Sequence, residues 1–190
     1  MNEAIIVENF NKTIVIRFNR PKERNPLSVF VLEKLHSILE TIELRTEKII
    51  FTGTDEVFAS GADLREIACV TKDTAREFAL RGQNLMLKIA CAEQATIAAI
   101  NGYCFGGALD LALSCDKRIA APNAQFSHPG ANLGIITGWG GTQRLPRLIG
   151  EAKALEMFLT AKRVSAGEAL RIGLIDEIAE NPLAKATNLL

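Results

Sequence analysis

The chain has 190 residues, of which 48% are apolar, and its 22 basic residues balance 22 acidic ones. This length and apolar content suffice for one domain, residues 1–190, with a buried core. A net charge of zero gives no electrostatic footprint for nucleic acid or for a membrane surface, and no apolar run approaches the length that spans a bilayer. Because no basic start with an apolar core precedes a cleavage site, we expect a cytoplasmic protein.

The first third of the chain predicts a hairpin, a helix and a strand. Residues 5–8 and 13–18 are short β-rich runs separated by a polar turn. Ser28 is a suitable N-cap, and apolar residues then recur at helical spacing to about Arg45. Residues 48–52 predict the next strand.

The middle of the chain contains the most unusual stretch. An amphipathic helix is predicted over residues 73–91, and residues 95–100 indicate a strand covered on both faces. Gly106 and Gly107 then open a segment that is apolar on nearly every face, with Asp110 as its only charge. A helix here must be buried. Its first N–H groups have no partner inside the helix, and the glycines let a ligand approach them closely, so they could hold an anion.

The last third continues the alternation of strands and helices. Strands are predicted at about 118–121, 125–127 and 174–178, and helices at 141–148, 152–161 and 165–171. Crossover connections between strands favour an α/β fold with mostly parallel pairing. The four cysteines lack Cys-x-x-Cys spacing, and their neighbours suggest burial in helices. We therefore expect no metal and no redox cofactor.

Four motifs in the same order resemble the crotonase superfamily, the enoyl-CoA hydratase/isomerase family. They are Asn19-Arg20-Pro21, residues 58–64, residues 101–116 and residues 140–145. The resemblance runs from about residue 14 to 178. It implies a crotonase-like spiral of strand-strand-helix units, with acyl-CoA as the substrate and a homotrimer or dimer of trimers as the assembly. In that family a C-terminal helical segment helps to cover the acyl-CoA pocket and to form the trimer. Since this chain stops at Leu190, we expect that segment to be missing, shortened or supplied from elsewhere.

The resemblance implies that the backbone amides of Ala62 and Gly107 form an oxyanion hole. Two such donors would favour the negative charge that develops on a thioester oxygen. The small neighbours Gly61 and Gly106 suit this close backbone approach. Read without the resemblance, the glycine pair could instead pack two elements together, and Gly61-Ala62 could be an ordinary turn.

Two further residues are candidates for proton transfer. Asp110 occupies the position of the first catalytic glutamate of the hydratases, and burial would raise its pKa; alternatively, the helix dipole alone stabilises it. The second catalytic glutamate directly follows a proline in hydratases, and here that position is Gly130. His128 could substitute for it, because its pKa lies near neutrality, or it could be a histidine satisfied within a loop.

The resemblance also implies a binding path for coenzyme A, whose thioester is the substrate. The alternatives are a solvated charge cluster for the basic residues near the first hairpin and core packing for Trp139. The expected substrate-binding residues are Arg20, Lys22, Arg24, Gly61, Asp63, Leu64, Arg65, Gly106, Gly130 and Trp139.

Hydration or isomerisation of an enoyl-CoA, in fatty-acid or related acyl-CoA metabolism, is the activity that the resemblance implies. A decarboxylation or other enolate reaction needs the oxyanion hole but no carboxylate at position 130, so it stays open. A third hypothesis is a non-catalytic acyl-CoA-binding or assembly subunit. The sequence alone does not choose among the three.

Overall fold

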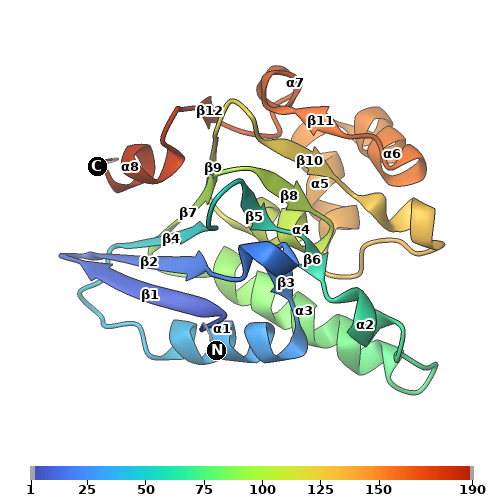
Figure 1. Ribbon diagram of the computed structural model, residues 1–190, viewed down its shortest axis with the longest axis horizontal. Helices are drawn as coiled ribbons and strands as arrows, with labels where there is room; N and C mark the ends of the chain where they lie inside the picture. Colours follow the sequence, from blue (N-terminus) through green and yellow to red (C-terminus); the bar gives the residue numbers. More distant parts are fainter. Residues whose placement is uncertain (1–2, 189–190) are drawn as a thin grey trace.

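The computed structural model describes residues 3–188, and its largest sheet has six strands (Figure 1). The first two strands form an antiparallel hairpin, and every later neighbouring pair in this sheet is parallel. This pairing confirms the predicted α/β class. In sheet order the strands are β1 (Ile5–Phe10), β2 (Thr13–Phe18), β4 (Lys48–Thr52), β7 (Ala95–Ile100), β9 (Lys117–Ala120) and β12 (Glu177–Ile178).

Shorter strands form two additional sheets. Each of β4, β7 and β9 leads into a strand of a four-stranded sheet before the chain enters its next helix, so the units follow one another as strand, strand and helix. This repetition is the expected spiral. The four-stranded sheet has the order β11 (Val164–Ser165), β10 (Gln125–Ser127), β8 (Tyr103–Phe105) and β5 (Val57–Ala59), and β3 (Pro26–Leu27) pairs with β6 (Gly61–Ala62).

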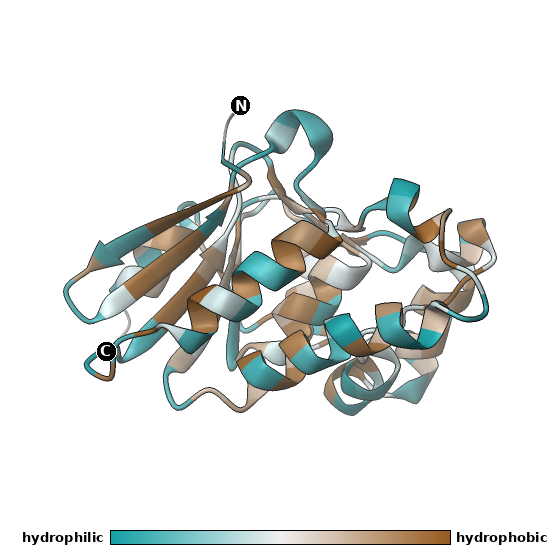
Figure 2. Ribbon diagram, turned by 90° about the horizontal axis from the view of Figure 1, so that it is seen from below, coloured by the Kyte–Doolittle hydropathy of each residue, from teal (hydrophilic) through white to brown (hydrophobic). Residues whose placement is uncertain are grey.

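Helices cover both sides of this framework. Two long helices, α1 and α3, run side by side beneath the sheets in Figure 1, and α4 lies inside the molecule. Seen from below in Figure 2, the two long helices α1 and α3 alternate between hydrophobic and hydrophilic segments, as expected when one face meets the core. The helices are α1 (Val29–Glu40), α2 (Leu64–Ile67), α3 (Ala75–Ala90), α4 (Gly107–Ser114), α5 (Gly141–Ile149), α6 (Glu151–Thr160), α7 (Ala166–Arg171) and α8 (Pro182–Thr187), with 3-10 turns η1 (Pro21–Glu23) and η2 (Pro129–Leu133).

Alternation along the strands divides the core into two parts. Ile14, Ile16 and Phe18 of β2 face the main core with α1, α3 and α4, whereas Val15 between them faces a smaller cluster. The smaller cluster lies under α8, which contributes the buried Ala186. Successive residues of a strand point to opposite faces, so a sheet with helices on both sides is apolar throughout. The continuous apolar run of β7 follows from this arrangement.

The structure differs from the sequence prediction at several element ends. Ser28 caps α1 as predicted and accepts a hydrogen bond from Val31 N–H, but the helix ends at Glu40 rather than near Arg45. The apolar pattern predicted too long a helix, because Ile42 still packs on the core although the helix has already ended. The last strand is also shorter than predicted, at two residues.

The cysteine prediction was wrong for most of the four residues. Cys104 is buried, but on strand β8, and Cys115 is buried at the end of α4. Cys69 and Cys91 are exposed. Within residues 3–188, no helix is long and apolar enough to cross a membrane.

Candidate active site

Two glycine-containing segments from distant parts of the chain meet at the start of α4. Gly61 of β6 has a φ of +86°, and a Cβ added to it would lie 2.6 Å from Gly107 N and 2.7 Å from Phe105 O. No side chain fits between them. Gly106, with a φ of +56°, turns the chain into the helix, and its N–H donates to Ser127 O at 2.9 Å. The backbone therefore brings the Gly61-Ala62 and Gly106-Gly107 segments into direct contact.

The start of α4 supplies an available donor. Gly107 is the first residue of this helix, so its N–H has no partner within the helix. The helix that carries it is buried from Ala108 to Ser114 and cannot move without disturbing the core. Ala62 and Gly107 both line a cavity of about 260 Å³. The two residues whose amides were predicted to form an oxyanion hole thus line the same cavity.

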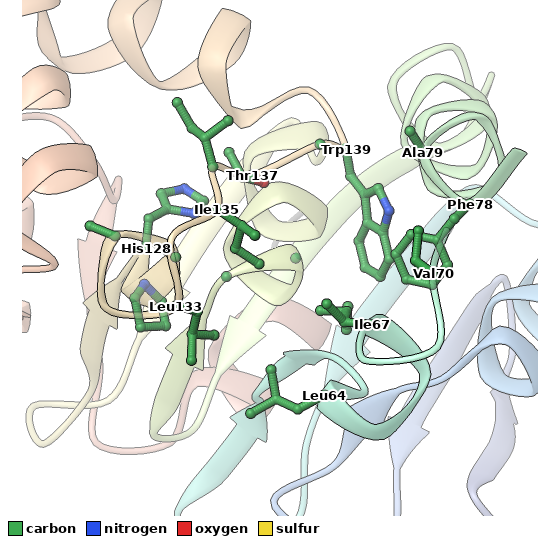
Figure 3. Close-up of a pocket in the computed structure, with 18 of the residues that line it drawn as sticks. Leu64, Ile67, Val70, Phe78, Ala79, His128, Leu133, Ile135, Thr137 and Trp139 are labelled. Carbon is green, nitrogen blue, oxygen red and sulfur yellow. The ribbon is translucent and has the colours of Figure 1, made fainter. Parts of the chain in front are cut away.

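Apolar side chains surround most of this cavity. Figure 3 shows His128 and Leu133 on one side and Trp139 with Phe78 on the other. The rim is partly open to solvent, because the side chains of Leu64, Leu133 and Ile136 are at least half exposed. An apolar chain could enter here. The apolar lining residues are Leu64, Ile67, Val70, Phe78, Leu133, Ile135, Ile136, Trp139 and Phe158.

Trp139 fixes the position of the helix start. It is only 3% exposed, and its indole packs between Gly107 and Gly82 of α3. A Cβ on Gly107 would lie 2.3 Å from the indole, and one on Gly82 would lie 2.2 Å from it. Glycine is therefore needed on both sides of the ring. Trp139 packs directly against Gly107, an oxyanion-hole candidate, and also forms part of the cavity wall.

Asp110 is fully buried behind the cavity wall and is not among the residues that line the cavity. Burial raises the pKa of its carboxyl to about 7. A hydrogen bond donated by the Thr137 hydroxyl to Oδ2, the Trp139 backbone N–H and the charge of Arg144 partly oppose this rise, since each favours the carboxylate. The start of α5 can approach the Asp110 carboxylate closely because residue 141 is glycine. A Cβ at this position would lie 2.1 Å from Asp110 Oδ1.

His128 lines the cavity and lies next to Asp110. Its Nε2 is 3.6 Å from Asp110 Oδ1, and its ring is 5.1 Å from the ring of Phe158. Burial lowers the pKa of His128 to about 4, because the charged imidazolium is poorly solvated there. Asp110 Oδ1 and both ring nitrogens of His128 have no hydrogen-bond partner among the described residues. Buried polar atoms are usually paired, so this group of atoms is a candidate for contact with a ligand.

Gly130 occupies a closed turn. It lies in η2, and its carbonyl accepts a hydrogen bond from Ile135 N–H at 3.0 Å. A Cβ on Gly130 would lie 2.5 Å from Ile135 O. The backbone of Ile135 lies where a side chain at position 130 would begin. In this conformation the turn therefore has no room for a glutamate, or for any other side chain, at this position.

The charged residues expected to bind coenzyme A separate into two groups, whereas Leu64, Gly106, Gly130 and Trp139 line the apolar cavity. Arg20, Asp63 and Arg65 line a second hollow of about 700 Å³, which shares Val70 and Phe78 with the apolar cavity. Asp63 caps α2 and pairs with Arg65 at 2.6 Å, and this hydrogen bond to Arg65 lowers the pKa of Asp63. Lys22 and Arg24 are exposed on or beside η1 and line neither hollow.

Several residues of the site had no signal in the sequence. Thr137 binds Asp110, Arg81 of α3 joins Arg20 and Arg65 around the second hollow, and Phe78 belongs to both hollows. Arg81 and Phe78 look like ordinary members of an amphipathic helix, and Thr137 lies in an irregular segment. Only the folded arrangement assigns them to the site.

Comparison with known proteins identifies relatives of this chain. The family model for enoyl-CoA hydratase/isomerase matches residues 8–186. The short-chain-enoyl-CoA hydratase of Clostridium acetobutylicum is 39% identical over 179 residues, covering 93% of this chain and 69% of that protein. The crotonyl-CoA hydratase of Syntrophomonas wolfei is 40% identical over 181 residues, covering 94% and 70% respectively.

A solved structure, the enoyl-CoA hydratase of Bacillus anthracis, superposes with a TM-score of 0.90 at 39% identity. The match covers 97% of this chain and 73% of that one. The fold and the site thus define an acyl-CoA enzyme of the hydratase/isomerase type. The chain belongs to the enoyl-CoA hydratase/isomerase family, within the crotonase superfamily.

Proposed function

We propose that the protein catalyses enolate chemistry on an acyl-CoA thioester, with the amides of Ala62 and Gly107 as the oxyanion hole. The contact between Gly61 and Gly107 N is the single observation that carries this proposal, because it puts both amide-bearing segments against one cavity. Fixed donors that meet a developing charge stabilise the transition state more than the ground state. No side chain needs to take part in that contact.

The two hollows fit the two ends of such a substrate. The apolar cavity suits an acyl chain, and the second hollow suits the phosphates of coenzyme A, since Arg20, Arg65 and Arg81 surround it. Asp63, Glu66 and Glu77 line the same hollow, so its three carboxylates balance its three arginines in number. Asp63 orients Arg65, and Glu77 pairs with Arg81 at 2.8 Å. Two relatives are named for short-chain and crotonyl-CoA substrates, which supports a short acyl group.

Isomerisation or hydration of an enoyl-CoA is the reaction we propose first. Decarboxylation of a malonyl-type CoA is the second candidate, and the closed turn at Gly130 favours it, since the Ile135 backbone leaves no room for a second carboxylate. Both reactions pass through an enolate at the same two amides. Either would place the protein in fatty-acid or related acyl-CoA metabolism.

A panel of CoA esters tests these alternatives. The full chain is incubated separately with crotonyl-CoA, 3-butenoyl-CoA and a malonyl-type CoA, and products are separated by chromatography. We expect turnover of at least one ester. Tight binding of an ester without any turnover would favour a non-catalytic binding subunit, and the absence of both binding and turnover would overturn the proposal.

The oligomeric state is also a proposal. We infer a homotrimer or a dimer of trimers, which the family resemblance supports, and light scattering of the purified chain measures it directly. A monomer at micromolar concentration would contradict this part of the proposal and leave the site intact.

A further inference from the structure

His128 and Asp110 have unequal access to the cavity. His128 belongs to the cavity wall together with Gly106 and Gly107, whereas Asp110 lies behind the wall and is fully buried. Figure 3 shows His128 beside Ile135 and Leu133, across the cavity from Trp139. A substrate bound at the two amides would therefore meet the imidazole before it could meet the carboxylate.

Most of the polar side-chain atoms of Asp110 and His128 take no part in hydrogen bonds within the fold. Asp110 Oδ2 accepts a hydrogen bond from Thr137, but Asp110 Oδ1, His128 Nδ1 and His128 Nε2 have no partner among the described residues. The 3.6 Å between Oδ1 and Nε2 is somewhat longer than a hydrogen bond. Leaving three buried polar atoms unpaired costs stability, so an additional role would account for them.

We propose that His128 transfers the proton at the acyl Cα and that Asp110 is the positioning residue behind it. This inference rests on the proposed function and deepens it, because it assigns the proton-transfer step to a histidine in place of a second carboxylate. Nε2 lies 3.6 Å from Asp110 Oδ1, so we assign the substrate to Nδ1, which is buried and has no partner among the described residues.

The proton-transfer step needs no additional reagent. His128 Nδ1 takes a proton from Cα, so that the C–H bond breaks and an N–H bond forms. The electron pair of the C–H bond enters the enolate, whose charge lies on the thioester oxygen at the two amides. Return of the proton to Cα restores the substrate. Where the substrate carries a β,γ double bond, the enolate is a dienolate, and delivery of the proton to Cγ moves the double bond to the α,β position and gives the isomer.

Asp110 makes this step easier because an ionised carboxylate stabilises the imidazolium that forms. Burial favours the neutral form of each group, because it raises the pKa of Asp110 to about 7 and lowers that of His128 to about 4. The carboxylate needed for this role is therefore present mainly above about pH 7. Among the described residues, two other titratable groups interact with Asp110. The Arg144 guanidinium on α5 favours the carboxylate, and the Cys104 thiol on β8 stays protonated because burial and the nearby Asp110 raise its pKa.

Exchange of the Cα protons of butyryl-CoA for deuterium in D₂O tests the assignment, with NMR as the readout. This saturated ester needs only the oxyanion hole and a base. We expect exchange by the native chain, a loss of about 10²- to 10⁴-fold in His128→Asn, and partial recovery of that variant with added imidazole. His36→Asn is the matched control, because His36 on α1 is the only other histidine of the chain.

Asp110→Asn tests the positioning role separately. We expect a slower exchange whose pH profile differs in shape from that of the native chain, which a merely structural effect would not produce; Asp110→Glu should recover part of the rate. An unchanged pH profile would overturn the role of Asp110.

Three outcomes separate failure of this inference from failure of the proposed function. Exchange at the native rate in His128→Asn overturns the inference alone, as does a native chain that binds butyryl-CoA without exchanging its protons. A native chain that binds no CoA ester overturns the proposed function as well. If His128→Asn fails to fold, His128→Gln replaces it, with butyryl-CoA binding as the check on its cavity.

Discussion

The two sides of the cavity are built on different principles. The side with Ala62 and Gly107 presents backbone amides, and its shape depends on glycines that let two segments touch. The side with His128 and Gly130 presents one titratable side chain and a closed turn. In the function that we propose, the first side stabilises negative charge on an acyl thioester, and the second determines where a proton is taken up or delivered. Under this proposal, the class of chemistry and the particular reaction are assigned to separate parts of the fold.

A large effect on turnover is expected from breaking the backbone side at Gly61. In Gly61→Ala, the new methyl group would lie 2.6 Å from Gly107 N, and the left-handed φ adds strain. We expect turnover of the preferred CoA ester to fall about 10²- to 10³-fold, as when one oxyanion donor is lost.

Gly150→Ala is the matched control for this change. Gly150 has a φ of +84°, close to that of Gly61, but a Cβ there meets nothing within 4 Å. It should share the backbone strain and lower the unfolding temperature, with turnover unchanged. Equal turnover in the two variants would show that contact between the glycine segments is unimportant for activity.

The side-chain half of the cavity should show opposite pH effects on stability. Folded Asp110 keeps its proton to about pH 7, whereas the unfolded carboxyl loses it near 3.8. Its contribution to the free energy of unfolding therefore falls as pH rises through this range. Folded His128 stays neutral to about pH 4, whereas unfolded histidine protonates near 6.5, so its contribution falls as pH decreases. Each slope is about 1.4 kcal/mol per pH unit where the two states differ fully in protonation.

Single substitutions separate these two slopes. As pH falls from 6.5 to 4, His128→Asn should gain stability relative to the native chain, and Asp110→Asn should lose it. Urea unfolding at several pH values measures both differences. Parallel pH curves for all three proteins would contradict the assignment of these shifts.

Gly130→Glu sharpens the comparison by placing a carboxylate where hydratases of the family carry one. Because a Cβ there would lie 2.5 Å from Ile135 O, we expect a loss of about 1–3 kcal/mol in the free energy of unfolding and no gain in hydration of crotonyl-CoA. Gly167→Glu is the control, since Gly167 on α7 faces open space. A strong gain in hydration at native stability would mean that the turn opens readily.

The smallest expected effect lies outside the cavity, at Arg20. Removing this half-buried cation from the second hollow in Arg20→Ala should weaken binding of a CoA ester about tenfold, or ~1.4 kcal/mol, and less at high salt. Arg45→Ala, on an exposed loop, should bind as the native chain does. Calorimetry compares the two, and equal affinities would exclude Arg20 from the coenzyme path.

The sequence predicted the regular parts of the fold because those parts are periodic. The strand at 48–52 was predicted with its bounds, and the buried helix was predicted to follow Gly106, because continuous apolar runs leave few alternatives. The strands β3, β6 and β11 have two residues each and carry no pattern. They form because longer elements bring their partners alongside, which local sequence does not record.

Part of the candidate site could be predicted from the sequence. Motifs that resemble a family indicated Ala62 and Gly107, which line one cavity in the structure, and the single charge in an apolar helix indicated Asp110. The sequence could not show that Asp110 lies behind the cavity while His128 lines it, because that order depends on how η2 and the segment around Thr137 pack against α4. Nor could it show that Ile135 closes over Gly130. Both facts are tertiary contacts.

The central claim is that two backbone amides bind a thioester oxygen. A crystal structure with a non-reactive acyl-CoA thioester analogue tests it most directly. The account predicts the thioester oxygen about 2.7–3.1 Å from both Ala62 N and Gly107 N, with the acyl Cα next to His128. An oxygen bound elsewhere in the cavity, with either amide turned away from it, would contradict the account.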